Sequence, residues 1–463
     1  MKYKKLLRPT VTVALVLILF FVFPGRVRNE FFRTVHLPAV RVDVDGSEFV
    51  FEACDILDKK YFAADSLSYP KILNSALNGL TLELKKYGIN FVPIEIDTIL
   101  SKDEAKKQFA SEFERAEKLA EPIKDSIGHN LEFAATTYLL WASGNSHNYF
   151  IYPGSLAYHK KINNGDKVFC EIGVRIESIA DTFFYLNDVF PNSPARDSGL
   201  KRFDRVLKID SINLSGKKLD EVKSLLSGAK STIIELTLQR KNEIFVIKVE
   251  IDNIARPLFS IDTIYCQEKK FMYVHLYSFM FRDSSIKVIQ QALIDAQTSF
   301  DGIVVDLRDN SGGLAKTESA MLNMFLDKGT LTFYEIGRNQ NDTSKFFTTD
   351  FPINNLPVVA LVNGNSASAA EEFAAIVQEN DKAVLIGEQS CGCDDNSFSY
   401  PLSFGSEMNV GTEKSFTGKG KRLEGSGVTP NFMSVFVKES ALCGEDSQIQ
   451  KALQVLEDKI NGR

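Results

Sequence analysis

The spacing of apolar residues first predicts a helical region. In Glu48–Phe62 and Leu73–Gly88 apolar side chains recur every three or four positions, which is typical of amphipathic helices. Ser101 and Glu104 form a Ser-x-x-Glu capping box in front of a third segment of this kind. We therefore expect residues 47–160 to form a helical region that leads into the rest of the fold.

The period of the pattern shortens to two in residues 165–255. Short alternating stretches separated by turns predict several short strands and two short helices. Lys241 and Asn242 fall at the expected turn of a hairpin between two of these strands. This stretch is predicted to be a separate small domain, a partly open β-barrel.

Buried apolar runs and helix-like segments alternate from residue 256 to residue 440. The runs Phe271–Phe279, Gly302–Leu307 and Val358–Val362 are expected to be strands, with helical segments between them. Such alternation predicts an α/β core with a mostly parallel crossover sheet, whose active positions lie at the carboxyl ends of its strands. Residues 441–463 are expected to form a C-terminal helix.

A turn of small residues follows the run Val358–Val362. It carries Ser366 and Ser368 and leads into a helix-like segment. A serine in this place gains from the free N–H groups of a helix N-terminus, which favour a developing anion. The N–H of Ala369 is then a candidate oxyanion donor. The other interpretation is that one of the two serines only caps the helix.

A second turn ends in Gly312 and Gly313, again after a buried strand. Glycine N–H groups can face an oxyanion with no side chain in the way, so both are candidate oxyanion donors. Asp306 and Arg308, just before this turn, are expected to brace it and to take no part in the chemistry.

Composition and charge restrict the kinds of molecule that the chain is expected to bind. Apolar residues make up 44% and charged residues 25% of the 463-residue chain, as in an ordinary globular protein. The net charge is -6 and basic residues cluster only at the extreme N-terminus, so nucleic acid is not an expected partner. The six cysteines form no zinc-binding pattern, and Cys391-Gly392-Cys393 is expected to be too tight for a mutual disulfide.

The first 30 residues are interpreted as a targeting segment. Cations at positions 2, 4, 5 and 8 precede a mainly apolar run, Val11–Phe23. That run has the length of a signal-peptide core and is shorter than the roughly 20 residues that span a membrane. We expect residues 1–30 to be a bacterial export signal, either cleaved or kept as a membrane anchor. The chain would then lie in the cell envelope, on the periplasmic side.

Three motifs of the core resemble the carboxyl-terminal processing protease and tricorn protease superfamily. They are Asp306–Gly313, Ser366–Glu372 and Val384–Gly392. The resemblance implies a ClpP/crotonase-like core, a serine peptidase that works through an acyl-enzyme, and no metal or organic cofactor. It also implies that Ser368, the second serine of the turn, is the nucleophile.

The alternating region resembles the PDZ domains inserted in such proteases. The motifs that carry this resemblance are Glu171-Ile172-Gly173-Val174, Ser193–Leu200 and Asp204–Leu207, with Phe203 where such domains usually have glycine. The resemblance implies that Glu171, Ile172, Gly173 and Val174 bind a polypeptide substrate. Backbone N–H groups would hold its terminal carboxylate, and an exposed strand edge would pair with its chain.

Two branches of this family use different residues as the base that activates the serine. One branch has a lysine where this chain has Cys393, so that dyad is missing. The tricorn branch uses a histidine placed before the PDZ domain, and the pair Ser146-His147 resembles it. The resemblance implies that His147 is the base, that Ser146 is a relay, and that Glu424 orients the ring through Ser146.

These observations favour an exported serine endopeptidase that acts on envelope or periplasmic proteins. The alternative is a catalytically inactive relative that acts as a PDZ peptide-binding scaffold, and the missing lysine supports it. A further alternative is a ligand carrier like the retinoid carriers of the superfamily. The PDZ domain argues against a carrier, because carriers of that kind lack one.

Overall fold

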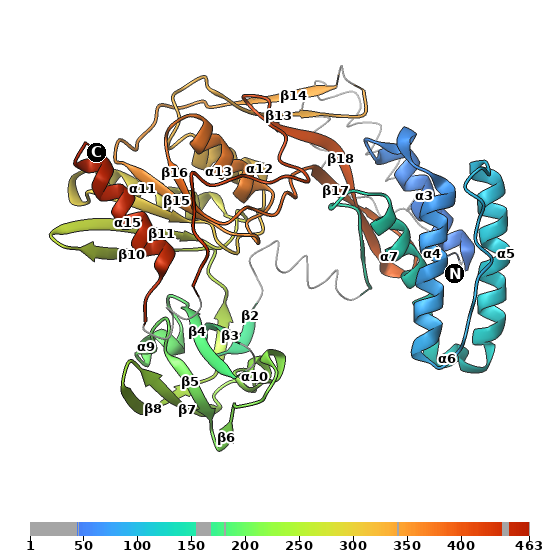
Figure 1. Cartoon of the computed structure of the whole chain (residues 1–463), viewed down its shortest axis with the longest axis horizontal. Helices are drawn as coiled ribbons and strands as arrows, with labels where there is room; N and C mark the ends of the chain where they lie inside the picture. The colour runs from blue at the N-terminus through green and yellow to red at the C-terminus, as the bar shows by residue number, and fades with distance from the viewer. Residues whose placement is uncertain are drawn as a thin grey trace, which may run out of the picture. The chain divides into compact units, whose positions relative to one another are not determined.

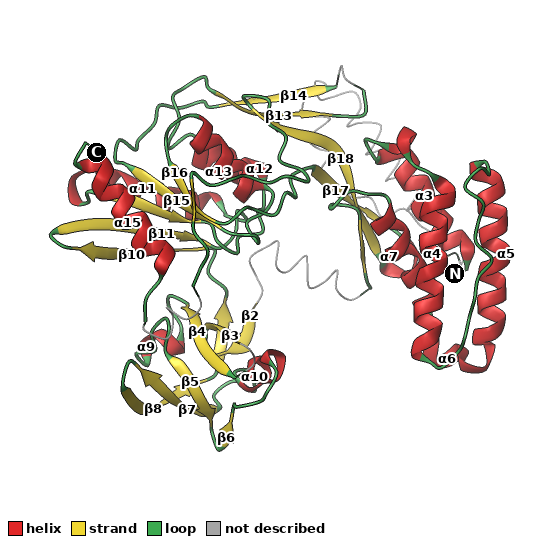
Figure 2. Cartoon of the chain, in the orientation of Figure 1, coloured by secondary structure: helices red, strands yellow, loops and turns green. Residues whose placement is uncertain are grey.

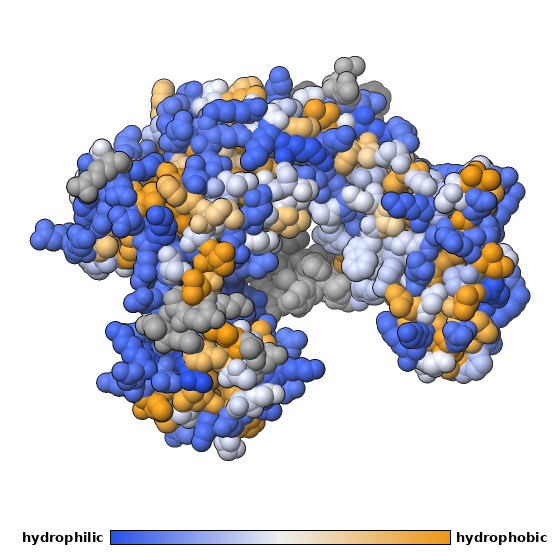
Figure 3. Space-filling model, in the orientation of Figure 1, coloured by the Kyte–Doolittle hydropathy of each residue, from blue (hydrophilic) through white to orange (hydrophobic). Residues whose placement is uncertain are grey.

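The computed structural model describes residues 44, 46–153, 168–179, 182–339, 342–437 and 444–462. The expected export or anchor segment, residues 1–30, lies outside these ranges. Within them, no helix is both long enough and apolar enough to cross a membrane. The chain from Asp45 to Arg463 forms one compact unit. On the face shown in Figure 3, hydrophilic residues dominate and hydrophobic ones occur in small groups.

The N-terminal region is helical, as its periodicity predicts (Figures 1 and 2). Its main helices are α3 (Ser47–Lys60), α4 (Tyr69–Lys86), α5 (Lys102–Ala120) and α7 (Asn130–Ala142), with the short α6 (Lys124–Ile127) before α7. The capping box is present, since Ser101 and Glu104 each accept a hydrogen bond from the other's backbone N–H. Among the described residues, α7 is followed by β1 (Tyr149–Ile151).

Residues 168–255 are built mainly from strands (Figure 2). The strands are β2 (Val168–Glu171), β3 (Val174–Ile179), β4 (Phe183–Val189), β5 (Arg205–Ile209), β6 (Ile212–Asn213), β7 (Ile233–Arg240), β8 (Glu243–Glu250) and β9 (Asp252–Ala255), with the helices α9 (Pro194–Asp197) and α10 (Leu219–Leu225). The main sheet has the order β3-β4-β5-β7-β8, with β6 beside β5, and β2 pairs with β9. Because β3 and β8 are edges, the predicted barrel is not confirmed.

The core sheet has the order β10-β11-β12-β15-β16-β19. Its strands are β10 (Phe259–Cys266), β11 (Lys269–Leu276), β12 (Gly302–Asp306), β15 (Val358–Val362), β16 (Val384–Gly387) and β19 (Phe432–Met433). Every neighbouring pair is parallel except β10 with β11. The prediction of a mostly parallel sheet is confirmed for this part of the core, while its ClpP/crotonase-like description stays a prediction.

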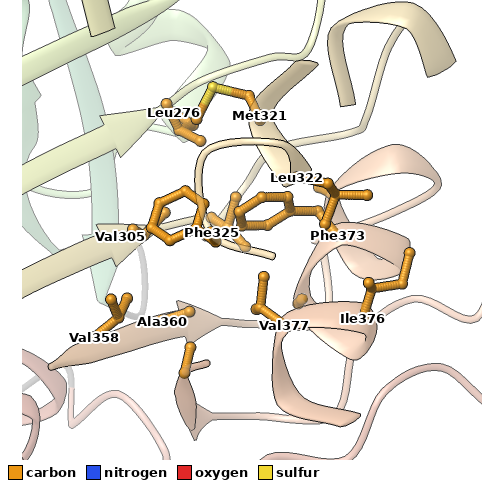
Figure 4. Close-up of a cluster of buried hydrophobic side chains, with 14 of the residues drawn as sticks. Leu276, Val305, Met321, Leu322, Phe325, Val358, Ala360, Phe373, Ile376 and Val377 are labelled. Carbon is orange, nitrogen blue, oxygen red and sulfur yellow. The ribbon is translucent and has the colours of Figure 1, made fainter. Parts of the chain in front are cut away.

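Helices cover both faces of the core sheet. On one face the strands pack against α11 (Asp283–Ser299), α12 (Ala315–Leu322) and α13 (Ala369–Glu379), and Figure 4 shows Val305, Val358 and Ala360 within this cluster. The residues that alternate with these pack on the other face against α15 (Ser447–Ile460). Because both faces of the sheet are buried, the sequences of its strands are continuous runs of apolar residues. The predicted C-terminal helix corresponds to α15.

A second sheet joins the helical region to the core, and the sequence did not predict it. It contains β1, β13 (Leu331–Ile336), β14 (Thr343–Phe347), β17 (Asn396–Pro401) and the long strand β18 (Glu407–Thr417). All its pairs are antiparallel, and Phe150 of β1 lies opposite Met408 of β18. Through this pairing, the turn just before β1 is brought to the core.

Candidate active site

The turn between β15 and α13 presents one of its two serines. Ser366 is fully buried, and its hydroxyl donates to the carbonyl of Leu307 at 2.8 Å. Ser368 is half-buried and has the backbone angles φ 54° and ψ -133°, which a non-glycine residue rarely adopts. A serine held on such a sharp strand-to-helix turn is typical of hydrolase nucleophiles. The geometry therefore favours Ser368 as the nucleophile and gives Ser366 a structural role.

The glycine turn after β12 packs directly against Ser368. A Cβ atom on Gly312 would lie 2.7 Å from the Cβ of Ser368, so only glycine allows this approach. The Gly312 N–H donates to the side-chain oxygen of Asn310 at 2.9 Å and is therefore occupied. Among the described residues, the N–H groups of Gly313 and Ala369 have no acceptor. The candidate oxyanion donors are thus Gly313 and Ala369, and Gly312 supplies the close approach instead.

Ser146, His147 and Glu424 form a hydrogen-bonded relay. The Ser146 hydroxyl donates to Oε1 of Glu424 at 2.8 Å, and its Oγ lies 3.1 Å from Nδ1 of His147. Because the single hydroxyl proton goes to Glu424, Nδ1 of His147 must be the protonated nitrogen and donate to Ser146. Nε2 then carries a free lone pair, which is the state of a general base.

The surroundings of the relay keep the imidazole neutral and the carboxylate charged. Burial lowers the pKa of His147, against the opposing effects of the Glu424, Asp395 and Glu371 charges. Burial alone would raise the pKa of Glu424, but the backbone N–H of Asp394 and the Ser146 hydroxyl lower it below the ordinary value. At neutral pH the site thus holds an unprotonated base beside an ionised carboxylate.

Three further residues position the relay, and no sequence motif marked them. Asn145 accepts a hydrogen bond from the His147 N–H at 2.9 Å and donates to Oδ2 of Asp395 at 2.7 Å. Arg422 donates to both oxygens of Asp395, at 2.8 and 2.9 Å. Asp395 thereby fixes the turn before β1 to the loop that follows β16.

Ser368 and His147 are not joined directly. In the described part of the chain no hydrogen bond connects the Ser368 hydroxyl with the ring. Glu371 nevertheless acts on both residues. Its carboxylate accepts a hydrogen bond from the Ser368 N–H at 3.2 Å, and its charge raises the pKa of His147.

Cys391 and Cys393 form a disulfide, contrary to the expectation from their spacing. Gly392 between them has φ +74°, and this turn brings the two Cα atoms 5.4 Å apart, within the range usual for disulfides. The lysine position of the other branch is therefore occupied by a bridged cysteine, which supplies no base.

Asp306 and Arg308 brace the glycine turn, as predicted. The two residues form a buried ion pair, and Arg308 also donates to Oε1 of Gln448 at 2.8 Å. The charge of Arg308 helps to keep the pKa of Asp306 well below its ordinary value although burial alone would raise it. The pair anchors the end of β12 to α15.

The PDZ-like region has a second glycine turn with a free donor. Gly173 has φ +86°, and a Cβ atom there would lie 2.3 Å from the Cβ of Ser193. Among the described residues, the N–H of Gly173 has no acceptor, while Ile172 lies next to the bridge between Glu171 and Ser227. Among the described strands, the adjacent β3, which begins at Val174, pairs with β4 alone. A peptide carboxylate at the turn and a peptide strand along β3 fit this arrangement.

Comparisons with known proteins identify the families that two parts of the chain match. Residues 270–434 match the family model described as peptidase family S41, and residues 185–240 match a PDZ domain. A putative S41 protease structure from Bacteroides fragilis has a TM-score of 0.57 and 14% identity. Its alignment covers 91% of this chain and 99% of that one, which supports the fold.

The curated relatives are named as processing proteases. The carboxy-terminal-processing protease of Bartonella bacilliformis is 30% identical over 253 residues, which are 52% of this chain and 56% of that protein. The chloroplastic carboxyl-terminal-processing peptidase 1 of Arabidopsis thaliana is 26% identical over 327 residues, 68% and 65% of the two chains. The chain thus spans between half and two thirds of the length of these relatives. It carries a peptidase family S41 domain together with a PDZ domain, which confirms the family resemblance of its motifs.

Proposed function

We propose that this chain is a serine endopeptidase with Ser368 as nucleophile and His147 as general base. The observation that carries the proposal is the relay from Glu424 through Ser146 to Nδ1 of His147, which leaves Nε2 free to accept a proton. The strained turn that presents Ser368 supports the same assignment.

The proposed reaction passes through an acyl-enzyme. Nε2 of His147 takes the proton of the Ser368 hydroxyl while Oγ attacks the scissile carbonyl carbon. The N–H groups of Gly313 and Ala369 hold the resulting oxyanion. The intermediate collapses, the C–N bond breaks, and the imidazolium gives its proton to the leaving amine. Water, activated by the same ring, then hydrolyses the ester at Ser368.

The proposed substrates are polypeptides recognised through their carboxyl termini. The support is the free N–H of Gly173 beside the edge strand β3, together with the names of the relatives. We also propose that the chain acts in the bacterial cell envelope, on the periplasmic side, with residues 1–30 as its export signal or anchor. The support for that is the cationic and apolar pattern of the first 23 residues.

Hydrolysis by the wild-type chain and by Ser368→Ala tests the proposal. The substrate is an unstructured peptide with a free carboxyl terminus, and the same peptide with an amidated terminus is the control. The wild type should cleave the free-acid peptide, and Ser368→Ala should lose cleavage while it still binds the peptide. Undiminished cleavage by a folded Ser368→Ala protein would refute the assignment.

A peptide-binding scaffold without activity is the second candidate function. The observation that favours it is the absence of a direct Ser368–His147 hydrogen bond among the described residues. If the wild type binds the free-acid peptide and never cleaves it, the scaffold is the correct function.

A further inference from the structure

The loop of residues 390–395, here called the Cys-Gly-Cys loop, holds the backbone around the nucleophile. The Ser368 N–H donates to the carbonyl of Cys393 at 2.8 Å. In return, the N–H groups of Gly392 and Cys393 donate to the carboxylate of Glu371 at 2.9 and 2.7 Å. Glu371 lies in the first turn of α13, so the loop fixes both the nucleophile and the helix that follows it.

The same loop holds the relay on its other side. The next two N–H groups, those of Asp394 and Asp395, donate to Oε2 of Glu424 at 2.7 and 3.2 Å. The Asp395 side chain also accepts a hydrogen bond from Asn145, whose oxygen holds the backbone of His147. This short loop therefore connects the nucleophile with the base, between which the described residues show no direct hydrogen bond.

The disulfide lies within this loop, between the hydrogen bonds that hold the nucleophile and those that hold the relay. It joins Cys391 to Cys393, whose carbonyl accepts from Ser368 and which directly precedes Asp394. A cross-link between residues two apart restricts the backbone angles of the residue between them. Gly392 fits tightly there, since a Cβ atom on it would lie 2.9 Å from the backbone nitrogen of Ser426.

We propose that the Cys391–Cys393 disulfide is a positioning element for catalysis, because it fixes the Cys-Gly-Cys loop that aligns Ser368 with the His147 relay. This inference rests on the proposed peptidase function and deepens it. The peptidase would then be fully active only while the pair is oxidised. Cys391 is exposed and Cys393 is half-buried, so a reductant in solution can reach the bond.

Reduction of the purified chain with dithiothreitol tests the inference. Each reagent molecule transfers two electrons and two protons to the S–S bond, leaves thiols on Cys391 and Cys393, and becomes a cyclic disulfide itself. We expect kcat to fall about 10- to 100-fold while KM changes less than twofold, since the loop aligns the reacting groups and does not bind the PDZ ligand. Removal of the reagent and reoxidation should restore kcat.

The double variant Cys391→Ser/Cys393→Ser should show the same low kcat in both redox states. The acid limb of its kcat/KM profile should move to lower pH, because the charge of Glu424, which raises the pKa of His147, is no longer held beside the ring. The variant Cys170→Ser/Cys266→Ser removes two partly exposed free thiols and should keep the wild-type response to dithiothreitol.

Each contrary outcome is distinct. Equal kcat for the oxidised and the reduced wild type, with proof of two new thiols by mass spectrometry, would overturn the inference and leave the peptidase assignment intact. A response to dithiothreitol that persists in the double variant would overturn it as well. If the oxidised wild type does not cleave the peptide at all, the proposed function itself fails, and the inference fails with it.

Discussion

Two glycine turns in this molecule can each bind an anion through backbone N–H groups, and the anion differs between them. At Gly313 in the core and at Gly173 in the PDZ-like region, a positive φ and a close neighbour exclude a Cβ atom. N–H groups without an acceptor among the described residues lie at both turns, those of Gly313 and Ala369 in the core and that of Gly173 in the PDZ-like region. The core turn lies beside Ser368 on its strained turn, and the turn of the PDZ-like region lies beside the open edge of β3.

The elements beside each turn therefore decide its role. Beside a nucleophile, free donors stabilise a charge that exists only during the reaction, which lowers the activation barrier. Beside an open strand edge, the same donors bind a permanent carboxylate, which contributes to affinity. Substitutions at the two places should consequently separate kcat from binding, and the following predictions test that separation.

The largest effect should come from the base. His147→Ala should lower kcat about 10³- to 10⁴-fold, because Ser368 then has no group that accepts its proton. Binding of a free-acid peptide to the PDZ region should not change. His129, which stacks on Phe404 with ring centroids 3.7 Å apart, is the matched control, and His129→Ala should keep the wild-type kcat. Steady-state hydrolysis and peptide titration measure both quantities.

The core glycine turn should give the next largest effect. In Gly313→Ala the new Cβ atom would lie 2.4 Å from the backbone carbon of Phe279, so the donor must move away from the oxyanion. We expect kcat to fall about 10²- to 10³-fold, as for the loss of one oxyanion donor. An unchanged kcat in a folded variant would remove Gly313 from the proposed oxyanion site.

The relay carboxylate should affect both the rate and its pH dependence. Glu424 raises the pKa of His147, so Glu424→Gln should move the acid limb of kcat/KM to lower pH. The same change removes the charge that stabilises the imidazolium, and we expect kcat to fall about 10- to 100-fold. In the wild type this limb should lie below pH 6.5, because burial lowers the pKa of His147. A limb that does not move would exclude Glu424 from the relay.

The PDZ glycine turn should show the opposite pattern. In Gly173→Ala the new Cβ atom would collide with Ser193, so the turn must distort and its donor must shift. Affinity for a free-acid peptide should fall about tenfold, roughly the loss of one hydrogen bond to a charged group. The kcat should stay within threefold of wild type. A drop in kcat as large as that of Gly313→Ala would show that the two turns do not act separately.

A separate prediction concerns stability, and it distinguishes the effect of pH on the fold from its effect on His147. Burial and the nearby Glu413 and Glu372 carboxylates raise the pKa of Glu335 to about 8. This raised pKa disfavours the charged form in the fold, so stability is lost as pH rises from the ordinary glutamate pKa to about 8. Glu335→Gln should therefore recover on the order of 2 to 4 kcal/mol at pH 9 and little at pH 4.

Urea unfolding at the two pH values measures this change. The exposed Glu243→Gln is the matched control and should change stability by less than about 0.5 kcal/mol at either pH. Equal unfolding free energies for the wild type and Glu335→Gln at pH 9 would contradict the expected effect of the buried carboxylates.

Local patterns were enough for much of the fold. The capping box at Ser101 and the apolar run of β15 depend on neighbouring residues, and the structure has both. The second sheet escaped prediction because β1 is only three residues long and its partner β18 lies far along the chain. Nothing near residue 149 in the sequence indicates that partner.

The sequence also indicated most residues of the candidate site. The motifs pointed to Ser368, and the family resemblance implied the relay of His147, Ser146 and Glu424. The occupied N–H of Gly312 was not predictable, because it depends on the rotamer of Asn310. The disulfide was not predictable either. It depends on the backbone turn at Gly392, which cannot be predicted from the residue types alone.

Covalent labelling with a fluorophosphonate probe, located by mass spectrometry, tests the central claim most directly. The account predicts a phosphonylated Ser368 in the wild type, an unmodified Ser366 in the same peptide, and labelling at least 100-fold slower in His147→Ala, because an unactivated hydroxyl is a weak nucleophile. A wild-type chain that cleaves peptides while its label sits on another residue would contradict the account. So would labelling of Ser368 at the same rate in the absence of His147.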